Sequence, residues 1–335
     1  MIPGAPHQAR WVRPGTRRAP EAPALQRIVH TAFPGCRVAA AQPLADGLRN
    51  ANFKLHLDSA GGVAVLRIYQ HDASLCQKEL DLMRLVAGSV PVPEVIHAEP
   101  RGLDDVPPFV LMSYVEGISF RELKRGGDSD AIAQAAYSAG ATLAALGRAI
   151  FERSGWLGPG PAVGAPLLAG ADPMPRFVDR CLESADLAGR VPAELRRAIH
   201  SLVWSFAPEL AHASDEARLV HGDFNKRNLL VKLIAGRWQV AAVLDWEFAI
   251  SGSPLADVAN FLRYERARRP LAEPHFSNGF LEGGGTLPRE WRRFSRVIDL
   301  IALCESLTRD ELPDDVAVDL MELVRATIED RDLRL

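Results

Sequence analysis

The spacing of hydrophobic and polar positions changes about one third of the way along the chain. Residues 52–57 (NFKLHL) and 63–69 (VAVLRIY) alternate around the turn-forming sequence DSAGG, which predicts a β-hairpin with Arg67 on one face. After Gly117, Ala- and Leu-rich segments with helical spacing dominate, as in AIAQAAYSAGATLAALGRAIF and FSRVIDLIALCESL. The pattern therefore predicts an α+β chain with a strand-rich front and a helix-rich remainder, joined near residues 112–117.

The front third holds three further predicted elements. A short helix is expected at about residues 24–33. A second helix begins at Ser74, where SLCQKELDLMRLVAG has apolar residues at helical spacing and Gly88 stands just past the end as a C-cap. PPFVLMSYVEG, from Pro107, predicts an apolar strand that runs into a connector. The residues before position 24 are basic and rich in Pro and Ala, so we expect a mobile tail there.

Composition narrows the class of protein. At 335 residues and 47% hydrophobic, the chain can bury a large core, as two domains or as one two-lobed unit. A net charge of −3 gives no strong positive field, so we expect no nucleic-acid partner. No apolar run reaches the roughly 18 residues of a membrane span, and the N-terminus lacks the apolar core of a signal peptide. We therefore expect a soluble cytoplasmic protein without a membrane partner.

The cysteines are far apart and form no C-x-x-C pair, which argues against a zinc knuckle or a redox dithiol. We expect four buried, reduced thiols: Cys36, Cys76, Cys181 and Cys304.

A polar insert at residues 221–228 (HGDFNKRN) separates two apolar runs and is too long and too charged for an ordinary turn. Downstream, NLLVKLIAGRWQVAAVLDWE predicts two strands about Gly236-Arg237, a pair that suits a two-residue type II′ turn. That register leaves one face of the hairpin apolar and places Asn228 directly opposite Asp245, with Cα atoms roughly 4.5–5.5 Å apart. Asp223, five residues before Asn228, can turn back towards the same spot.

Two carboxylates and an amide oxygen, with no His or Cys ligand, form a hard-oxygen site that suits Mg²⁺ and not zinc. Because Mg²⁺ keeps several waters and takes phosphate oxygens, we expect a nucleotide nearby. The alternative is that Asp223 and Asn228 are turn and strand-cap residues of a polar loop. The common geometry of Asp223, Asn228 and Asp245 favours the metal site.

HGDFNKRN resembles the catalytic loop H-G-D-x-x-x-x-N of the aminoglycoside phosphotransferases and their relatives, which include choline and related small-molecule kinases. VLDWE is similar to the metal-binding segment of that family, and GLRNANFKL, VLRIY and GSPLADVANF resemble further segments in the same order. The likeness covers roughly residues 40–265. It implies a two-lobed protein-kinase-like fold with four parts: a flexible basic tail (1–23), an N-terminal nucleotide-binding lobe (24–112), a hinge (113–117) and a C-terminal catalytic and substrate lobe (118–335).

The resemblance implies a role for the polar residues around the insert. Asp223 would be the catalytic base that receives or positions the proton of an attacking hydroxyl. Asn228 and Asp245 would be Mg²⁺ ligands that bridge the nucleotide phosphates. His221 and Asp257 would hold the loop in place by hydrogen bonds.

The residues that the resemblance places around the nucleotide are Gly47, Asn50, Arg67, Glu79, Met112, Ser113 and Val115. Arg67 would hold phosphate in a bidentate fork and pair with Glu79 from the following helix. Lys54, on the neighbouring strand, is the competing phosphate contact. The Ser113 carbonyl and the Val115 amide are expected to bind adenine, with Met112 packed behind it. ATP is the expected donor, with GTP as the open alternative.

The sequence gives a less specific signal for the acceptor site than for the nucleotide site. From Glu265 to the C-terminus the chain has 15 acidic and 11 basic residues, a mild excess that suits an amine-bearing acceptor. Acidic residues that could line its site are Glu247, Glu265, Asp299 and Glu305, although a solvated helix face explains such charges as well. Glu247 leads this set because it follows Asp245 by two residues. Lys226 and Arg227 either touch the γ-phosphate or face solvent, and the sequence leaves that open.

Three functions fit these observations. The first is an ATP-dependent kinase of a hydroxyl on a small molecule, with an aminoglycoside-like or other amine-bearing antibiotic as the leading acceptor. The second is the same chemistry on a choline-like amino alcohol, a macrolide, a peptide antibiotic or a sugar. The third is a nucleotide-binding regulator without transfer activity, against which the intact set Asp223, Asn228 and Asp245 argues. No protein partner is implied.

Overall fold

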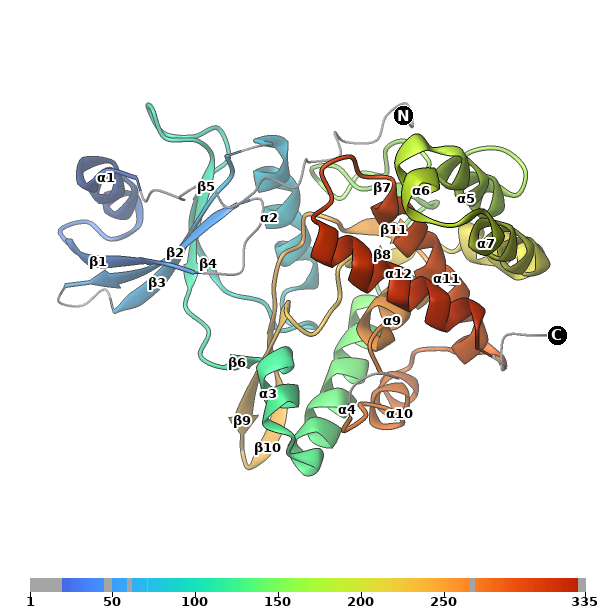
Figure 1. Cartoon of the computed structure of the whole chain (residues 1–335). Helices are drawn as coiled ribbons and strands as arrows, with labels where there is room; N and C mark the ends of the chain where they lie inside the picture. The colour runs from blue at the N-terminus through green and yellow to red at the C-terminus, as the bar shows by residue number, and fades with distance from the viewer. Residues whose placement is uncertain (1–19, 45–49, 59–61, 71, 266–268, 331–335) are drawn as a thin grey trace. The chain divides into compact units, whose positions relative to one another are not determined.

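The computed structural model describes residues 20–44, 50–58, 62–70, 72–265 and 269–330. Most of the expected tail, and the turn that contains Gly47, lie outside the described residues. The chain divides into two compact units (Figure 1). The first unit comprises Met1–Ala87, Pro91–Glu116 and Gly158–Ala162, and the second comprises Gly88–Val90, Gly117–Leu157 and Val163–Leu335.

The first unit is built on one antiparallel sheet in the order β1-β2-β3-β5-β4. Its elements are α1 (Ala22–Ala32), β1 (Val38–Pro43), β2 (Ala51–Leu57), β3 (Val63–Ile68), α2 (Ser74–Val86), β4 (Val95–Glu99) and β5 (Phe109–Ser113). The predicted β2–β3 hairpin is confirmed, with Phe53 paired to Leu66 and Asn52 to Arg67. The sequence analysis did not predict β1 and β4, because neither has a clear alternation of buried and exposed residues.

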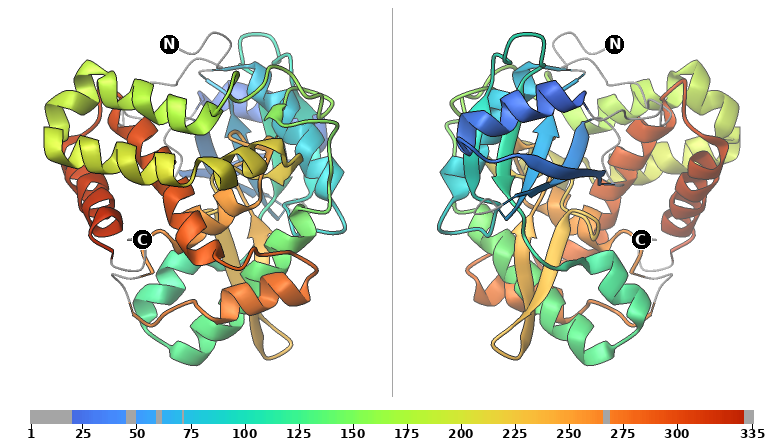
Figure 2. Two further views of the ribbon diagram at one scale, coloured as in Figure 1. Left: turned by 90° about the vertical axis from the view of Figure 1, so that its right-hand side faces the viewer. Right: turned by 90° about the vertical axis from the view of Figure 1, so that its left-hand side faces the viewer.

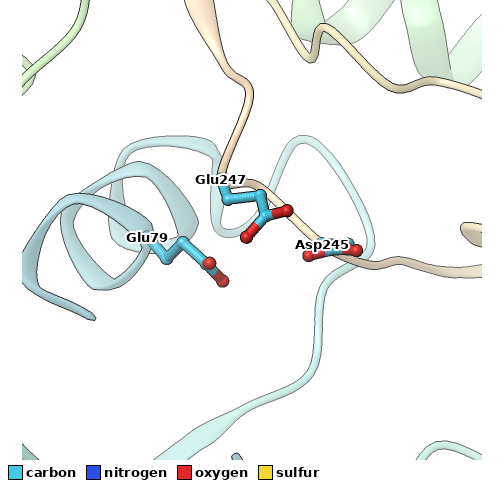
Figure 3. Close-up of side chains that lie close together, drawn as sticks. All are labelled: Glu79, Asp245 and Glu247. Carbon is cyan, nitrogen blue, oxygen red and sulfur yellow. The ribbon is translucent and has the colours of Figure 1, made fainter. Parts of the chain in front are cut away.

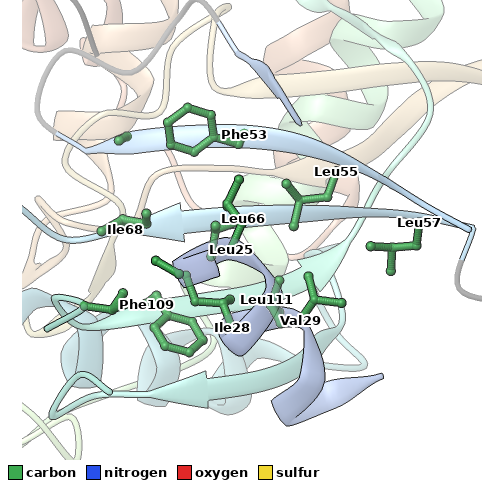
Figure 4. Close-up of a cluster of buried hydrophobic side chains, with 13 residues drawn as sticks. Leu25, Ile28, Val29, Phe53, Leu55, Leu57, Leu66, Ile68, Phe109 and Leu111 are labelled. Atoms are coloured by element: carbon green, nitrogen blue, oxygen red, sulfur yellow. The ribbon is translucent and has the colours of Figure 1, made fainter. Parts of the chain in front are cut away.

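One face of this sheet is covered by α1, while α2 lies on the other (Figure 1). Along β2 every second residue is buried, as the alternation predicts. Leu25, Ile28 and Val29 of α1 pack against the buried side chains of β2, β3 and β5 in a single apolar cluster (Figure 4). The residues between them, Arg67 included, therefore face α2.

The end of α2 differs slightly from the prediction. The helix stops at Val86, and Ala87 is exposed with extended backbone angles (φ −53°, ψ 135°). Gly88 has φ +84°, a left-handed conformation that glycine adopts without steric cost. The predicted glycine stop is therefore present, but Ala87 is not part of the helix.

The second unit combines helices with two small sheets, in the orders β10-β9-β6 and β7-β11-β8. Its strands are β6 (Ile118–Ser119), β7 (Gly155–Trp156), β8 (Arg218–Val220), β9 (Leu229–Ile234), β10 (Arg237–Val243) and β11 (Ile250–Gly252). Its helices are α3 (Phe120–Gly126), α4 (Ser129–Leu146), α5 (Pro173–Glu183), α6 (Ala185–Arg190), α7 (Ala193–Ser205), α8 (Ala207–Asp215), α9 (Leu255–Leu262), α10 (His275–Glu282), α11 (Trp291–Leu307) and α12 (Asp314–Ile328). Figure 2 shows α5, α7, α11 and α12 side by side, and these helices contact one another.

The predicted register of the β9–β10 hairpin is wrong. The turn is Ala235-Gly236, and because both residues have positive φ (49° and 80°) it is of type I′. The register then shifts between Val240 and Ala242, where a bulge takes up one residue. At the open end Asn228 therefore lies opposite Leu244, whose N–H donates to the Asn228 carbonyl at 2.9 Å, and not opposite Asp245.

All four cysteines are free. Burial raises the pKa of Cys76 and of Cys181 to about 12, and it raises that of Cys304 as well. Cys36 is only half-buried, so the expectation of four buried thiols is wrong for this one. Among the described residues, no helix combines the length and the apolar character that a membrane crossing requires.

Candidate active site

The loop at residues 221–228 joins β8 to β9, and its first turn is fixed by the chain around it. Gly222 has φ +78°, and a Cβ at this position would lie 2.3 Å from the Phe248 carbonyl oxygen, so only glycine fits. The Asp257 carboxylate on α9 accepts the backbone N–H groups of His221 at 2.6 Å and of Gly222 at 3.0 Å. Asp257 is fully buried, which raises its pKa to about 7 although these N–H groups favour the ionised form. One helix side chain thus anchors the start of the loop.

His221 holds the loop from inside. Its Nε2 lies 3.0 Å from the Leu244 carbonyl, and its Nδ1 lies 3.2 Å from the backbone N–H of Asp223. Because a carbonyl only accepts and an N–H only donates, Nε2 carries the proton and Nδ1 is the acceptor. The ring lies 4.7 Å from that of Trp246, and burial lowers the pKa of His221 against the opposing charges of Asp223 and Asp245. His221 is therefore neutral with both nitrogens engaged.

The Asp223 carboxylate is surrounded by amide donors. Asn225 Nδ2 donates to Oδ1 at 2.7 Å, Asn228 Nδ2 donates to Oδ2 at 2.8 Å, and Asn260 Nδ2 on α9 reaches Oδ1 at 3.4 Å. These three contacts hold the carboxylate in one orientation. Asn228 Nδ2 also donates to the Asp223 carbonyl at 3.0 Å, so the amide oxygen of Asn228 faces away from Asp223. That oxygen is the one a metal ion requires.

Two further carboxylates follow β10. Asp245 has φ +70°, a conformation that is uncommon for residues other than glycine and that recurs at functional sites. Carboxylate oxygens of Asp245 and Glu247 lie within 4.8 Å of each other, and Figure 3 shows the two side chains on the segment after β10. Trp246, between them in sequence, is buried and donates its indole N–H to Val243 O at 3.2 Å. Together with Asn228 these residues offer only oxygen donors, which fits Mg²⁺.

Within the first unit, Arg67 and Glu79 form a buried ion pair. Arg67 Nη2 donates to Glu79 Oε1 at 2.8 Å, and the two side chains are only 8% and 3% exposed. Glu79 projects from α2 (Figure 3). Lys54 shares the sheet face of Arg67, but its Nζ lies over the Tyr114 ring, 3.8 Å from the centroid. Arg67 is thus held in one orientation, while Lys54 is turned towards an aromatic ring.

The expected adenine contacts lie at the end of β5. Met112 is buried, at 7% exposure. Asn50, which precedes β2 and is expected near the phosphates, is also buried, at 4% exposure. The N–H and the hydroxyl of Ser113 both bond the Glu94 backbone, at 2.8 and 2.9 Å, which fixes the strand end. The backbone N–H of Val115 donates to no described residue, so this donor is available to a ligand.

Comparisons with known proteins bear on the family and the fold of this chain. The family model described as "Phosphotransferase enzyme family" matches residues 40–295. The chain belongs to this phosphotransferase family. A curated relative from Gallus gallus, acyl-CoA dehydrogenase family member 11, is 29% identical over 222 residues, which is 64% of this chain. The match covers 26% of that relative, so the chain spans about a quarter of the length of the curated protein it matches.

Solved structures of aminoglycoside phosphotransferases share the fold. Aminoglycoside 2′-phosphotransferase-IIIa with GDP has a TM-score of 0.70 at 17% identity, covering 92% of this chain and 99% of that chain. The 2″-phosphotransferase with GDP and kanamycin has a TM-score of 0.68 at 18% identity, covering 90% and 97%. A thermostable mutant of APH(4)-Ia with AMP-PNP and hygromycin B has a TM-score of 0.66 at 17% identity, covering 91% and 98%. The expected α+β protein-kinase-like fold is confirmed.

In this phosphotransferase-family chain, Glu265 lies in a buried charge cluster. Its Oε1 forms ion pairs with Lys124 and, at 3.2 Å, with Lys226, and its Oε2 accepts the N–H of Ala272 at 2.5 Å. The two lysines hold the pKa of Glu265 below its ordinary value, although burial alone would raise it. Lys226 also donates to the Phe261 carbonyl, and burial lowers its pKa to about 8. The Lys226 side chain therefore points into the protein, where Glu265 and the Phe261 carbonyl bind its ammonium group.

The remaining acidic candidates lie on α11. Asp299 is 9% exposed, and its Oδ1 accepts Nε of Arg263 at 2.9 Å and Nη2 at 2.7 Å. Burial raises the pKa of Glu305, against the smaller effect of Arg309.

Three residues near the site, Asn225, Asn260 and Arg263, were not predicted as site residues from the sequence. For Asn260 and Arg263 a signal existed, because they follow Asp257 at helical spacing.

Proposed function

We propose that the protein transfers the γ-phosphate of a nucleotide to a hydroxyl of a small molecule. The observation that carries this proposal is the carboxylate of Asp223, fixed by amide donors, beside the oxygen donors Asn228, Asp245 and Glu247 in one unit. Phosphoryl transfer requires alignment of an attacking hydroxyl and stabilisation of phosphate charge more than covalent chemistry. This set of residues supplies both requirements.

Each residue then has a defined task. Asp223 accepts a hydrogen bond from the acceptor hydroxyl and takes its proton as the new bond forms. The hydrogen bonds that it accepts from Asn225 and Asn228 hold it in the orientation required. Asn228 Oδ1 and Asp245 would hold Mg²⁺, which when bound neutralises phosphate charge. His221 and Asp257 keep the loop in shape and take no part in proton transfer.

The nucleotide donor is ATP in this proposal, with GTP as the open alternative. Arg67, oriented by Glu79, presents a guanidinium suited to phosphate oxygens. The unengaged N–H of Val115 and the Ser113 carbonyl would bind the base, Met112 would pack against it, and Gly47 with Asn50 would lie at the phosphates. Structures that share the fold were determined with AMP-PNP, ADP and GDP, which supports a nucleotide-binding role.

The acceptor is a small hydroxyl compound. Hygromycin B and kanamycin are named in the complexes of the related structures, and Glu247 next to Asp245 favours an amine-bearing acceptor of that kind as the first candidate. Glu265 and Asp299, however, already form ion pairs inside this chain, which leaves fewer carboxylates for a polycation. A kinase of another small acceptor is therefore the second candidate.

A direct test is Mg²⁺-dependent ADP release across a panel of hydroxyl acceptors, with Asp223→Asn as the matched inactive variant. We expect at least one acceptor to stimulate release by the unmodified protein and not by the variant. If the protein binds nucleotide but no acceptor in a broad panel raises turnover, the regulator alternative replaces the kinase.

A further inference from the structure

One face of α9 follows the 221–228 loop. Asp257, Asn260 and the C-cap residue Arg263 are spaced by three residues, so each lies beside the one before it on the helix surface. Asp257 binds the loop backbone, and Asn260 contacts the Asp223 carboxylate at 3.4 Å. Arg263 comes one turn later, at the end of the helix. Arg263 therefore comes next after Asn260, which contacts Asp223. Burial lowers the pKa of Arg263, but Asp299 and, to a smaller extent, Asp223 raise it above its ordinary value.

The guanidinium of Arg263 is held in a single orientation. Two of its nitrogens, Nε and Nη2, donate to Asp299 Oδ1 at 2.9 and 2.7 Å. The third nitrogen, Nη1, donates to no described residue, and the side chain is 21% exposed. Asp299 comes from α11, so two helices fix this group. The result is a preoriented cation with a donor left over.

The charges around Arg263 bear on what this donor can bind. Asp299 neutralises Arg263, while Glu265 is shared between two lysines, Lys124 and Lys226. The cluster of Glu265, Lys124 and Lys226 has one positive charge in excess when both lysines are protonated. A cationic acceptor group would find these carboxylates engaged and would meet a guanidinium and an ammonium cluster instead. An anionic group would find an unengaged N–H donor on a cation.

We propose that Arg263 binds an anionic group of the acceptor, a carboxylate or a phosphate, close to the hydroxyl that donates a hydrogen bond to Asp223. The inference rests on the proposed function and favours its second candidate, a small acceptor other than an amine-bearing antibiotic. A guanidinium matches the planar oxygens of a carboxylate and the oxygens of a phosphate, and such charge-assisted bonds are the stronger ones. Binding at Arg263 would fix one end of the acceptor and so orient its hydroxyl towards Asp223.

The test compares acceptors that differ only in charge. ADP release with Mg²⁺ is measured for short hydroxy acids, for the primary amide of each, for the corresponding amino alcohols and for alcohols that carry a phosphomonoester. We expect kcat/KM for the anionic member of a matched set to exceed that of its neutral member roughly 10- to 150-fold, the effect of one charge-assisted hydrogen bond. Carboxylate and phosphate members of the panel distinguish the two anions.

Variants of the pair locate the effect. Arg263→Gln should reduce the preference for the anion to near unity and leave KM for the nucleotide unchanged. Because this change leaves Asp299 without its cation, the double variant Arg263→Gln with Asp299→Asn restores a neutral hydrogen-bonded pair and should show the same loss of preference. Thermal unfolding of both variants reports whether the fold is kept.

The outcomes separate this inference from the proposed function. If neutral or amine-bearing members turn over as fast as the anions, phosphoryl transfer stands and the role of Arg263 is wrong. The inference is equally wrong if the preference for anions survives in Arg263→Gln. If no member of any charge is phosphorylated although nucleotide binds, the proposed function fails and the inference fails with it.

Discussion

Replacing Asp223 by asparagine tests the centre of the proposed mechanism, and the structure gives the expected consequences in detail. In the wild type, one carboxylate oxygen accepts a hydrogen bond from the Asn225 amide at 2.7 Å, and the other accepts one from the Asn228 amide at 2.8 Å. Asparagine has one acceptor oxygen, so one of these bonds must be lost or reversed. Losing a hydrogen bond to a charged group costs about 1.5–3 kcal/mol of unfolding free energy. The assay is therefore run well below the unfolding temperature of the variant.

The effect on rate should be much larger than the effect on stability. Loss of a positioned general base lowers kcat by roughly 10²- to 10⁴-fold. The side chain at position 223 would keep its oxygen towards Asn225 and turn its NH₂ towards Asn228, which forces the Asn228 amide to rotate. The oxygen of Asn228 then no longer points to the metal position. We therefore expect nucleotide affinity without Mg²⁺ to stay within about threefold, because Asp223 need not touch the nucleotide, and the gain from Mg²⁺ to shrink.

Single-turnover kinetics and isothermal titration with and without Mg²⁺ measure these quantities. Asn260→Ala is the matched control, because it removes the longest of the three amide contacts and keeps the carboxylate. Its kcat should fall less than about tenfold, since the two shorter bonds still orient the base. If Asp223→Asn retained more than a tenth of the wild-type kcat, or if it lost metal-free nucleotide binding, its assignment as the base would be refuted.

Four shorter predictions follow from the same contacts. Asp245→Asn should lose the Mg²⁺-dependent part of nucleotide affinity as well as rate, and equal ATP affinity with and without Mg²⁺ in the wild type would contradict the metal site. Arg67→Ala should weaken nucleotide binding while Lys54→Ala changes it little, and the reverse ranking in titrations would mean that the phosphate contact is misassigned. Gly222→Ala should lower the unfolding temperature and the activity together, because a Cβ would lie 2.3 Å from a backbone oxygen; an unchanged melting curve would argue against the turn. Glu265→Gln should cost about 3–5 kcal/mol of unfolding free energy by leaving two buried ammonium groups without a counter-charge, and denaturant unfolding that changes by less than about 1 kcal/mol would contradict the buried cluster.

The sequence by itself determined the elements whose signals are local. Period-two alternation located β2 and β3, and helical spacing located α2, α4 and α11, because each pattern is written within one segment. The loop around Asp223 could also be located from the sequence, because its polar and charged residues interrupt two apolar runs. The pairing of Arg67 with Glu79 was predicted from a resemblance, and these side chains do bond each other.

Only the tertiary structure decided the contacts between segments. The turn of the β9–β10 hairpin shifted because Ala235 as well as Gly236 takes a positive φ, and a bulge then changed which residue faces Asn228. Lys226 turned inward because Glu265, 39 positions later, offers a buried counter-charge. Arg263 and Asp299, 36 residues apart, meet only when α9 packs on α11. Such partners are set by packing between distant segments, and no periodicity along the chain records them.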